Sequence, residues 1–83
     1  MDALPTLVLY DIPGNKQRKR ISDACLDYGL ERIQKSAFLG YLSRNRREEL
    51  QKRLSHELGQ ACGRIEVFPL RDMELLKSWH LVR

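Results

Sequence analysis

The sequence predicts an α+β domain in which strands and helices follow the order β, α, β, β, α, β. Segments rich in aliphatic and aromatic residues, typical of strands, lie at 6–12, 31–43 and 64–70. Between them lie amphipathic segments with apolar residues three or four positions apart, typical of helices. With 83 residues, 42% hydrophobic and 31% charged, the chain has the size and composition of one folded domain covering 1–83.

The first strand and the first helix are separated by a clear break. Residues 6–12, TLVLYDI, are almost wholly apolar, which is typical of a central strand covered on both faces. The tripeptide PGN then ends the strand, and Gly14 or Asn15 can cap a helix at 15–28. Gly29 is suited to end that helix. The core-facing stripe of the helix consists of Ile21, Ala24, Cys25 and Tyr28.

The middle of the chain predicts two strands and a second helix. Apolar and polar residues alternate imperfectly over 31–43, which predicts two short strands joined by a tight turn near Lys35 and Ser36. Ser43 is a suitable N-cap for an amphipathic helix that runs to about residue 58. Its apolar stripe repeats every four positions, at Leu50, Leu54 and Leu58.

The last strand lies at 64–70, RIEVFPL, and Pro69 predicts that it forms an edge of the sheet or bends. The tail, 72–83, predicts a short helical turn or loop followed by WHLV as a small extra strand.

This element order is the split βαβ arrangement of ferredoxin-like folds, here with an extra C-terminal strand. Right-handed crossovers place both helices on one face of an antiparallel sheet and leave the other face open. A chain of this size buries a modest fraction of its surface, so a second copy covering the open face would stabilise it. We therefore expect a homodimer with the two sheets packed face to face.

The net charge of +4 and the pI near 9.4 favour anionic partners, such as nucleic acid or an acidic membrane surface. Cys25 and Cys62 lie far apart without a Cys or His cluster, so neither a zinc site nor a disulfide is predicted. We expect both thiols to be reduced and partly buried. The N-terminus, with Asp2 and Pro5, resembles neither a signal peptide nor a membrane span, so we expect a cytoplasmic protein with no membrane partner.

Four cations, Lys16, Arg18, Lys19 and Arg20, lie in the first turns of the first helix. The positive end of the helix macrodipole disfavours cations there, and bound phosphates would compensate. The alternative is a solvated charged face, to which such runs often belong.

Asp11 ends the first strand, at the rim of the sheet, where an ionised carboxylate can hold a hard cation such as Mg²⁺. One carboxylate is too few for a dedicated site, but a two-fold axis could supply a second. The alternative reading is a helix cap or an ion pair with Arg18 or Arg20.

Further cations, at Arg32 and Lys35 and along the second helix, are expected to form a solvated face with some phosphate contacts. Phe38 and the other aromatic residues could stack on bases, although in so small a chain they are more often core or dimer contacts. The serines Ser36 and Ser43 lack the context of a catalytic nucleophile.

Three stretches, VLYDIPGNKQRKRI, YGLERIQKSAFLGYLS and RIEVFPL, resemble in order and spacing the small CRISPR-associated adaptation protein, also called the CRISPR-associated endoribonuclease. This family accompanies the integrase in spacer acquisition. The resemblance implies a ferredoxin-like homodimer in which the last strand of one subunit crosses to the neighbour's sheet. Family members are described as metal-dependent endonucleases on single-stranded RNA or duplex DNA, or as non-catalytic scaffolds for prespacer DNA.

The resemblance also assigns roles to single residues. Asp11 is implied to be the catalytic, metal-binding acid for Mg²⁺ or Mn²⁺, met across the two-fold axis by its counterpart. Positions linked to nucleic-acid handling in the family are occupied here by Arg18, Arg20, Arg32 and Phe38, with Tyr10 beside them. Gly14 and Asn15 stand where many members carry further acids. Fewer acids mean fewer ligands, so a scaffold without catalysis is the alternative function, and a single-stranded RNA-binding module is the third.

Overall fold

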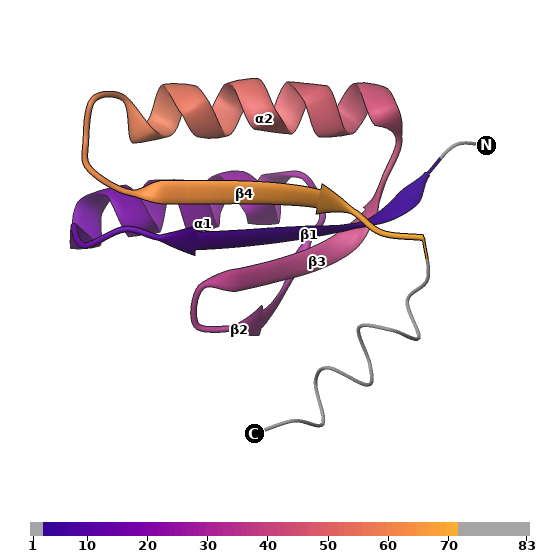
Figure 1. The fold of residues 1–83 in the computed structure, drawn as a ribbon, viewed down its shortest axis with the longest axis horizontal. Coiled ribbons are helices and arrows are strands. Elements are labelled where there is room, and N and C mark those ends of the chain that lie inside the picture. The colour runs from indigo at the N-terminus through magenta and orange to yellow at the C-terminus, as the bar shows by residue number, and fades with distance from the viewer. Residues whose placement is uncertain (1–2, 72–83) are drawn as a thin grey trace.

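The computed structural model describes residues 3–71, and the expected extra strand in the tail lies outside them. The chain forms four strands and two helices in the predicted order (Figure 1). Their bounds are β1 Leu4–Asp11, α1 Asn15–Asp27, β2 Glu31–Gln34, β3 Ala37–Leu42, α2 Arg44–Leu58 and β4 Arg64–Pro69. The predicted α+β, ferredoxin-like architecture is confirmed. The largest difference is in β1, which begins two residues earlier than predicted, at Leu4, because its first residues pair with the end of β3.

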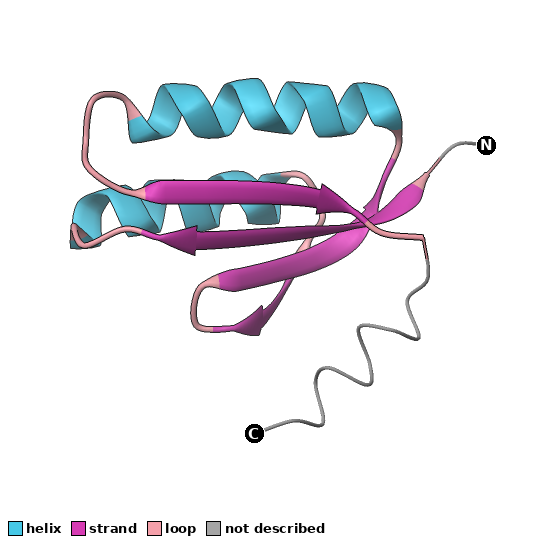
Figure 2. Cartoon of the chain, in the orientation of Figure 1, coloured by secondary structure: helices cyan, strands magenta, loops and turns pink. Residues whose placement is uncertain are grey.

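The sheet is antiparallel with the strand order β2-β3-β1-β4. The central position of β1 was predicted from its apolar sequence. Within the described part of the chain β4 pairs with β1 alone, as expected for a strand that ends in Pro69. Both helices lie on the same side of the sheet (Figure 2).

The core lies between the sheet and the two helices. Val8 of β1 and Phe38 of β3 are fully buried, and Ile21 of α1 and Leu50 of α2 close over them. Both predicted helix stripes are therefore confirmed, with Tyr28 and Leu58 as their partly buried ends.

Local signals fix the ends of the elements. Ser43 Oγ accepts a hydrogen bond from the Arg46 backbone N at 3.2 Å, which confirms the predicted cap of α2. Gly29 has a φ of 82°, a left-handed conformation that glycine adopts without a steric penalty, and it follows the end of α1. The N-cap of α1 is Gly14, and no side chain caps that helix end.

The face of the sheet opposite the helices is apolar at its centre. Leu7 lies between Leu39 of β3 and Phe68 of β4 in register, and Pro5 pairs with Tyr41. Tyr41 is 60% exposed and Phe68 is 40% exposed. This is the face that we expect a second copy of the chain to cover, and the homodimer stays a prediction.

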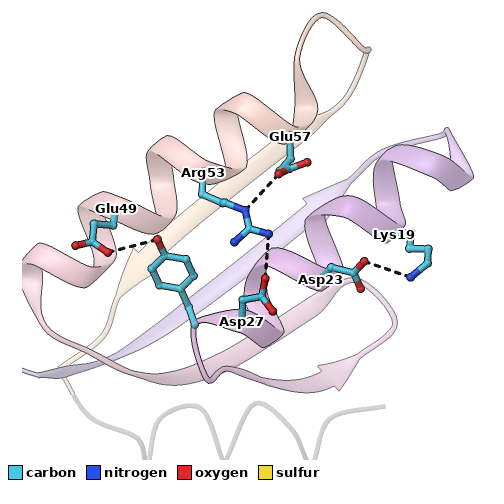
Figure 3. Close-up of polar contacts among 7 residues, drawn as sticks. Lys19, Asp23, Asp27, Glu49, Arg53 and Glu57 are labelled. Atoms are coloured by element: carbon cyan, nitrogen blue, oxygen red, sulfur yellow. Dashed lines mark hydrogen bonds and ion pairs between the residues drawn. The ribbon is translucent and has the colours of Figure 1, made fainter.

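Charged side chains tie the two helices together on their outer surface (Figure 3). Arg53 of α2 donates to Asp27 of α1 at 3.0 Å and to Glu57 at 3.2 Å. The Tyr28 hydroxyl donates to Glu49 at 3.4 Å, and the guanidinium of Arg46 lies 4.3 Å from the centre of the Tyr28 ring. Each cation here has an anionic side chain as its partner.

The two cysteines differ from the expectation that both are partly buried. Cys25 is fully buried in the core, whereas Cys62 is exposed in the loop before β4. Burial raises the pKa of the Cys25 thiol from its ordinary 9.0 to about 12, and the positive charge of Arg32 opposes that rise. Neither of the described helices is long and apolar enough to cross a membrane.

Candidate nucleic-acid interface

A cleft of about 570 Å³ lies where the C-terminal end of β1 meets α1 and the turn between β2 and β3. It gathers side chains that are distant in the sequence. The residues that line it are Tyr10, Asp11, Ile12, Arg18, Lys19, Ser22, Asp23, Arg32, Lys35 and Ser36.

Helix periodicity explains which α1 residues line the cleft. Arg18 and Ser22 are four positions apart, as are Lys19 and Asp23, so the two pairs share one side of the helix. The opposite wall comes from β2 and the turn after it, because the β2-β3 hairpin lies at one edge of the sheet.

Arg32 is held in the cleft by three contacts. Its Nη1 donates to the Lys35 carbonyl at 2.5 Å, and its Nη2 donates to the Ser22 hydroxyl oxygen at 2.7 Å. The guanidinium carbon lies 4.8 Å from the centre of the Phe38 ring, a cation–π arrangement. None of these contacts neutralises the charge of Arg32.

Arg18 is held by the segment that joins β1 to α1. Its Nη1 donates to the carbonyl oxygens of Ile12 and Pro13, each at 2.8 Å, and its Nη2 donates to the Asn15 side chain. The helix start therefore places a cation beside the end of β1, and no carboxylate in the described part of the chain pairs with it.

Tyr10 and Phe38 are buried aromatic residues that contact Arg32 and the turn at Lys35, and so support the cleft residues. Phe38 is fully buried, so it carries the Arg32 guanidinium on one side of its ring and cannot stack on a base in this structure. Tyr10 is 6% exposed, and its hydroxyl donates to the Lys35 carbonyl at 3.5 Å. The Tyr10 backbone N also bonds the Ser36 carbonyl at 3.1 Å, so β1 fixes the turn of the hairpin.

The cleft is electropositive. It is lined by four cations, Arg18, Lys19, Arg32 and Lys35, and by two carboxylates, those of Asp11 and Asp23, which leaves two positive charges in excess. Lys19 pairs with Asp23 at 3.2 Å, an exposed contact that water and salt screen. A concave site with this balance favours an anion.

Asp11 is exposed at the rim of the cleft, on the face of the sheet opposite the helices. Within residues 3–71 its side chain makes no ion pair and no hydrogen bond, so neither alternative, the cap or the pair with Arg18 or Arg20, is formed there. Arg64 lies opposite Asp11 in register but pairs with Glu66 at 3.5 Å. The Asp11 carboxylate is therefore open to a cation or to solvent.

One chain supplies too few ligands for a dedicated metal site. In the part of the chain that the structure describes, no three His, Cys, Asp or Glu residues lie close enough to hold a metal ion. Asp11 offers oxygen ligands of the type that Mg²⁺ prefers, but a second carboxylate would have to come from another chain.

Some of the candidate site residues named from the sequence line the cleft, and others do not. Asp11, Tyr10, Arg18, Lys19 and Arg32 line the cleft. Lys16 and Arg20 are exposed on α1 but do not line it. The polar cleft residues that the sequence analysis missed are Ser22 and Asp23, although their positions four residues after Arg18 and Lys19 place them on the same face of the helix.

An α+β domain of this topology, with a cation-lined cleft beside an exposed carboxylate, belongs to the class of small domains suited to binding anionic ligands. The family can be named more closely. Residues 5–77 match the family described as CRISPR associated protein Cas2. The chain belongs to this family, as the resemblance predicted.

Two curated relatives support the assignment. The CRISPR-associated endoribonuclease Cas2 of Desulforudis audaxviator is 43% identical over 75 residues, which cover 90% of this chain and 71% of that protein. A CRISPR-associated endonuclease Cas1/endonuclease Cas2 fusion of Thermoproteus tenax is 39% identical over 62 residues, 75% of this chain and 24% of the fusion.

A solved structure has the same fold. The hypothetical protein TT1823 from Thermus thermophilus aligns with a TM-score of 0.77 and 28% sequence identity, over 84% of each chain. Thus the fold that the sequence predicted is also found in a crystal structure.

Proposed function

We propose that this chain works in CRISPR adaptation as a homodimer that binds nucleic acid through the cleft and cleaves phosphodiesters with a divalent metal ion. The observation that carries the proposal is that Arg18, Arg32 and Lys35 line the same cleft as Asp11, whose carboxylate at the rim has no partner among residues 3–71. Cations and a carboxylate together are what a phosphodiester and its metal ion require.

The open face of the sheet supports the homodimer. Leu7, Leu39 and Phe68 form an apolar centre on the face where Asp11 also lies. Leu7 is only 9% exposed, so the surface that a copy would remove from water belongs mainly to Phe68 and Tyr41, which are 40% and 60% exposed. The same packing could bring the Asp11 carboxylates of two chains to one two-fold axis, and so supply the second acid that a single chain lacks.

The chemistry of the donor set fits Mg²⁺ or Mn²⁺, held by the paired Asp11 carboxylates together with waters and substrate phosphate oxygens. Such an ion, when bound, polarises the phosphodiester and lowers the pKa of a water. Arg18 and Arg32 then hold the phosphate by their N–H groups and stabilise the negative charge that grows on it. Their hydrogen bonds to carbonyl oxygens fix both guanidinium groups before substrate arrives.

The proposed partners are a CRISPR integrase and the prespacer duplex. The Thermoproteus tenax relative joins a Cas1 endonuclease and a Cas2 endonuclease in one chain, which supports a physical association between the two proteins. Single-stranded RNA is the alternative substrate, since the curated relatives carry the name endoribonuclease.

A non-catalytic scaffold in the same complex is the second candidate function. It is favoured by the single carboxylate at the end of β1, with no cluster of three possible ligands in the described chain. A single-stranded RNA-binding module is not proposed, because Phe38 is fully buried and the exposed aromatic side chains of the open sheet face, Tyr41 and Phe68, lie on the surface that the proposed homodimer would cover.

Cleavage assays with Asp11→Asn separate the two candidates. Purified wild type and variant are incubated with labelled single-stranded RNA and duplex DNA, with Mg²⁺, with Mn²⁺ and with chelator. If the protein is a nuclease, the wild type should cleave substrate only with the metal ion. The cleavage rate should fall by about 100-fold or more in the variant, while binding of the substrate persists. Uncleaved substrate with equal binding by both proteins would instead establish the scaffold.

A further inference from the structure

We propose, resting on the proposed function, that Ser22 is a positioning residue for Arg32 and a third donor, beside Arg18 and Arg32, to the bound phosphodiester. The observation is the hydrogen bond from Arg32 Nη2 to Ser22 Oγ at 2.7 Å, inside the cleft. This contact joins β2 to α1, residues ten positions apart in the sequence.

The contact fixes the direction of the guanidinium. Arginine has a long side chain with many rotamers, and its planar fork recognises a phosphate only when it is oriented. Arg32 uses one N–H toward Ser22 and one toward the Lys35 carbonyl, while Phe38 supports one face of the plane. Residues 3–71 use two of the five guanidinium donors, and the other three have no partner among them and can face a ligand.

Ser22 is a polar residue at a buried position of α1, where packing against the core alone would favour an apolar residue. It is 8% exposed, and its neighbours on the inner side of α1 are the apolar Ile21, Ala24 and Cys25. A buried hydroxyl group costs free energy unless it is hydrogen-bonded, and Arg32 supplies the donor that satisfies its oxygen.

The hydroxyl proton of Ser22 is still available. Its oxygen accepts from Arg32, and among residues 3–71 the hydroxyl donates to no acceptor. A phosphate oxygen held by Arg32 and Arg18 in the cleft would accept this proton, since Ser22 lies on the cleft wall. The ligand class is thus a phosphodiester, bound by two charged donors and one neutral donor.

The first test follows Arg32 itself in the free protein, so it does not depend on whether nucleic acid is bound. In ¹⁵N NMR spectra the Arg32 Nη–H groups should exchange slowly in the wild type and rapidly in Ser22→Ala. The control is Ser55→Ala, which removes an exposed hydroxyl group of α2 that does not line the cleft. Unchanged Arg32 signals in Ser22→Ala would overturn the positioning role.

The second test is a double-mutant cycle on the affinity for a duplex DNA of mixed sequence. Ser22→Ala should weaken binding by about 5- to 10-fold. The variant loses the hydroxyl donor itself, and it also loses the contact that orients the Arg32 guanidinium. In a protein that already carries Arg32→Gln, Ser22→Ala should reduce the affinity by a smaller factor than it does in the wild type, because Ser22 acts partly through Arg32. Full additivity, or wild-type affinity in Ser22→Ala, would contradict the inference.

The two proposals fail in different ways. If the wild type binds neither duplex DNA nor single-stranded RNA, the proposed function is wrong, and the phosphodiester part of this inference falls with it. If the wild type binds and Ser22→Ala binds equally well, the function stands and only the role of Ser22 is refuted. A circular dichroism melting curve for each variant excludes loss of the fold as the cause.

Discussion

Two charged regions lie beside α1, the contact with α2 and the cleft, and they differ in the groups that bind their arginine side chains. On the side that faces α2, Arg53 pairs with Asp27 and Glu57, and Arg46 pairs with Glu49. In the cleft, Arg18 and Arg32 are bonded to backbone carbonyls and to the side chains of Asn15 and Ser22. Their charges are thus fixed in place, and no carboxylate among residues 3–71 neutralises them. The first arrangement stabilises the contact between helices, and the second prepares a site for an anion. A count of charges in the sequence cannot distinguish the two regions.

The helix-helix side of this comparison predicts an effect on stability alone. Arg53→Gln should lower the melting temperature by a few degrees, because it breaks the tie between α1 and α2. Nucleic-acid affinity should stay near that of the wild type. Arg44→Gln is the matched control, since Arg44 pairs with Glu48 on the same helix and its loss should shift the melting temperature less. A large loss of binding by Arg53→Gln would mean that the two regions do not act separately.

A smaller effect is expected at high pH. The pKa of Cys25 is raised by burial to about 12, so the folded state holds the thiol proton more tightly than the unfolded chain does. The stability that this provides is complete below pH 9.0 and is lost as the pH rises toward about 12. Denaturant melts at several pH values should therefore show a steeper alkaline decline for the wild type than for Cys25→Ala.

The same burial predicts thiol reactivity. Cys62, which is exposed, should react with a thiol reagent at once, and Cys25 only after unfolding. Two equally fast thiols in the folded protein would show that the inner side of α1 opens readily and that its packing is not as described.

The fold was predictable because each element carries its own local signal. The apolar run of β1, the stripe of Leu50 and Leu54 and the Ser43 cap act over a few residues, and the structure confirms each. Even the division of the α1 cations follows from helix periodicity, since Lys16 and Arg20 are four positions apart and lie outside the cleft.

The site was predictable only in part, because its key contacts join distant segments. Arg32 meets Ser22 and Phe38 only after the β2-β3 hairpin docks beside α1. The burial of Phe38 depends on the whole core, so its role as the support for Arg32 has no signature in the local sequence. The second carboxylate that a metal site needs belongs to another chain in our proposal, and no single chain can reveal it.

The salt dependence of duplex binding tests most directly the claim that the cleft binds phosphates. We would compare the wild type with Arg18→Gln/Arg32→Gln, and with Arg44→Gln/Arg46→Gln, which removes the same charge from α2. The cleft variant should bind more weakly and lose about 1.8 from the slope of log K against log salt concentration, which corresponds to two phosphate contacts. The α2 variant should keep the wild-type slope. Equal losses in the two variants would contradict the account, because binding would then follow net charge and not the cleft.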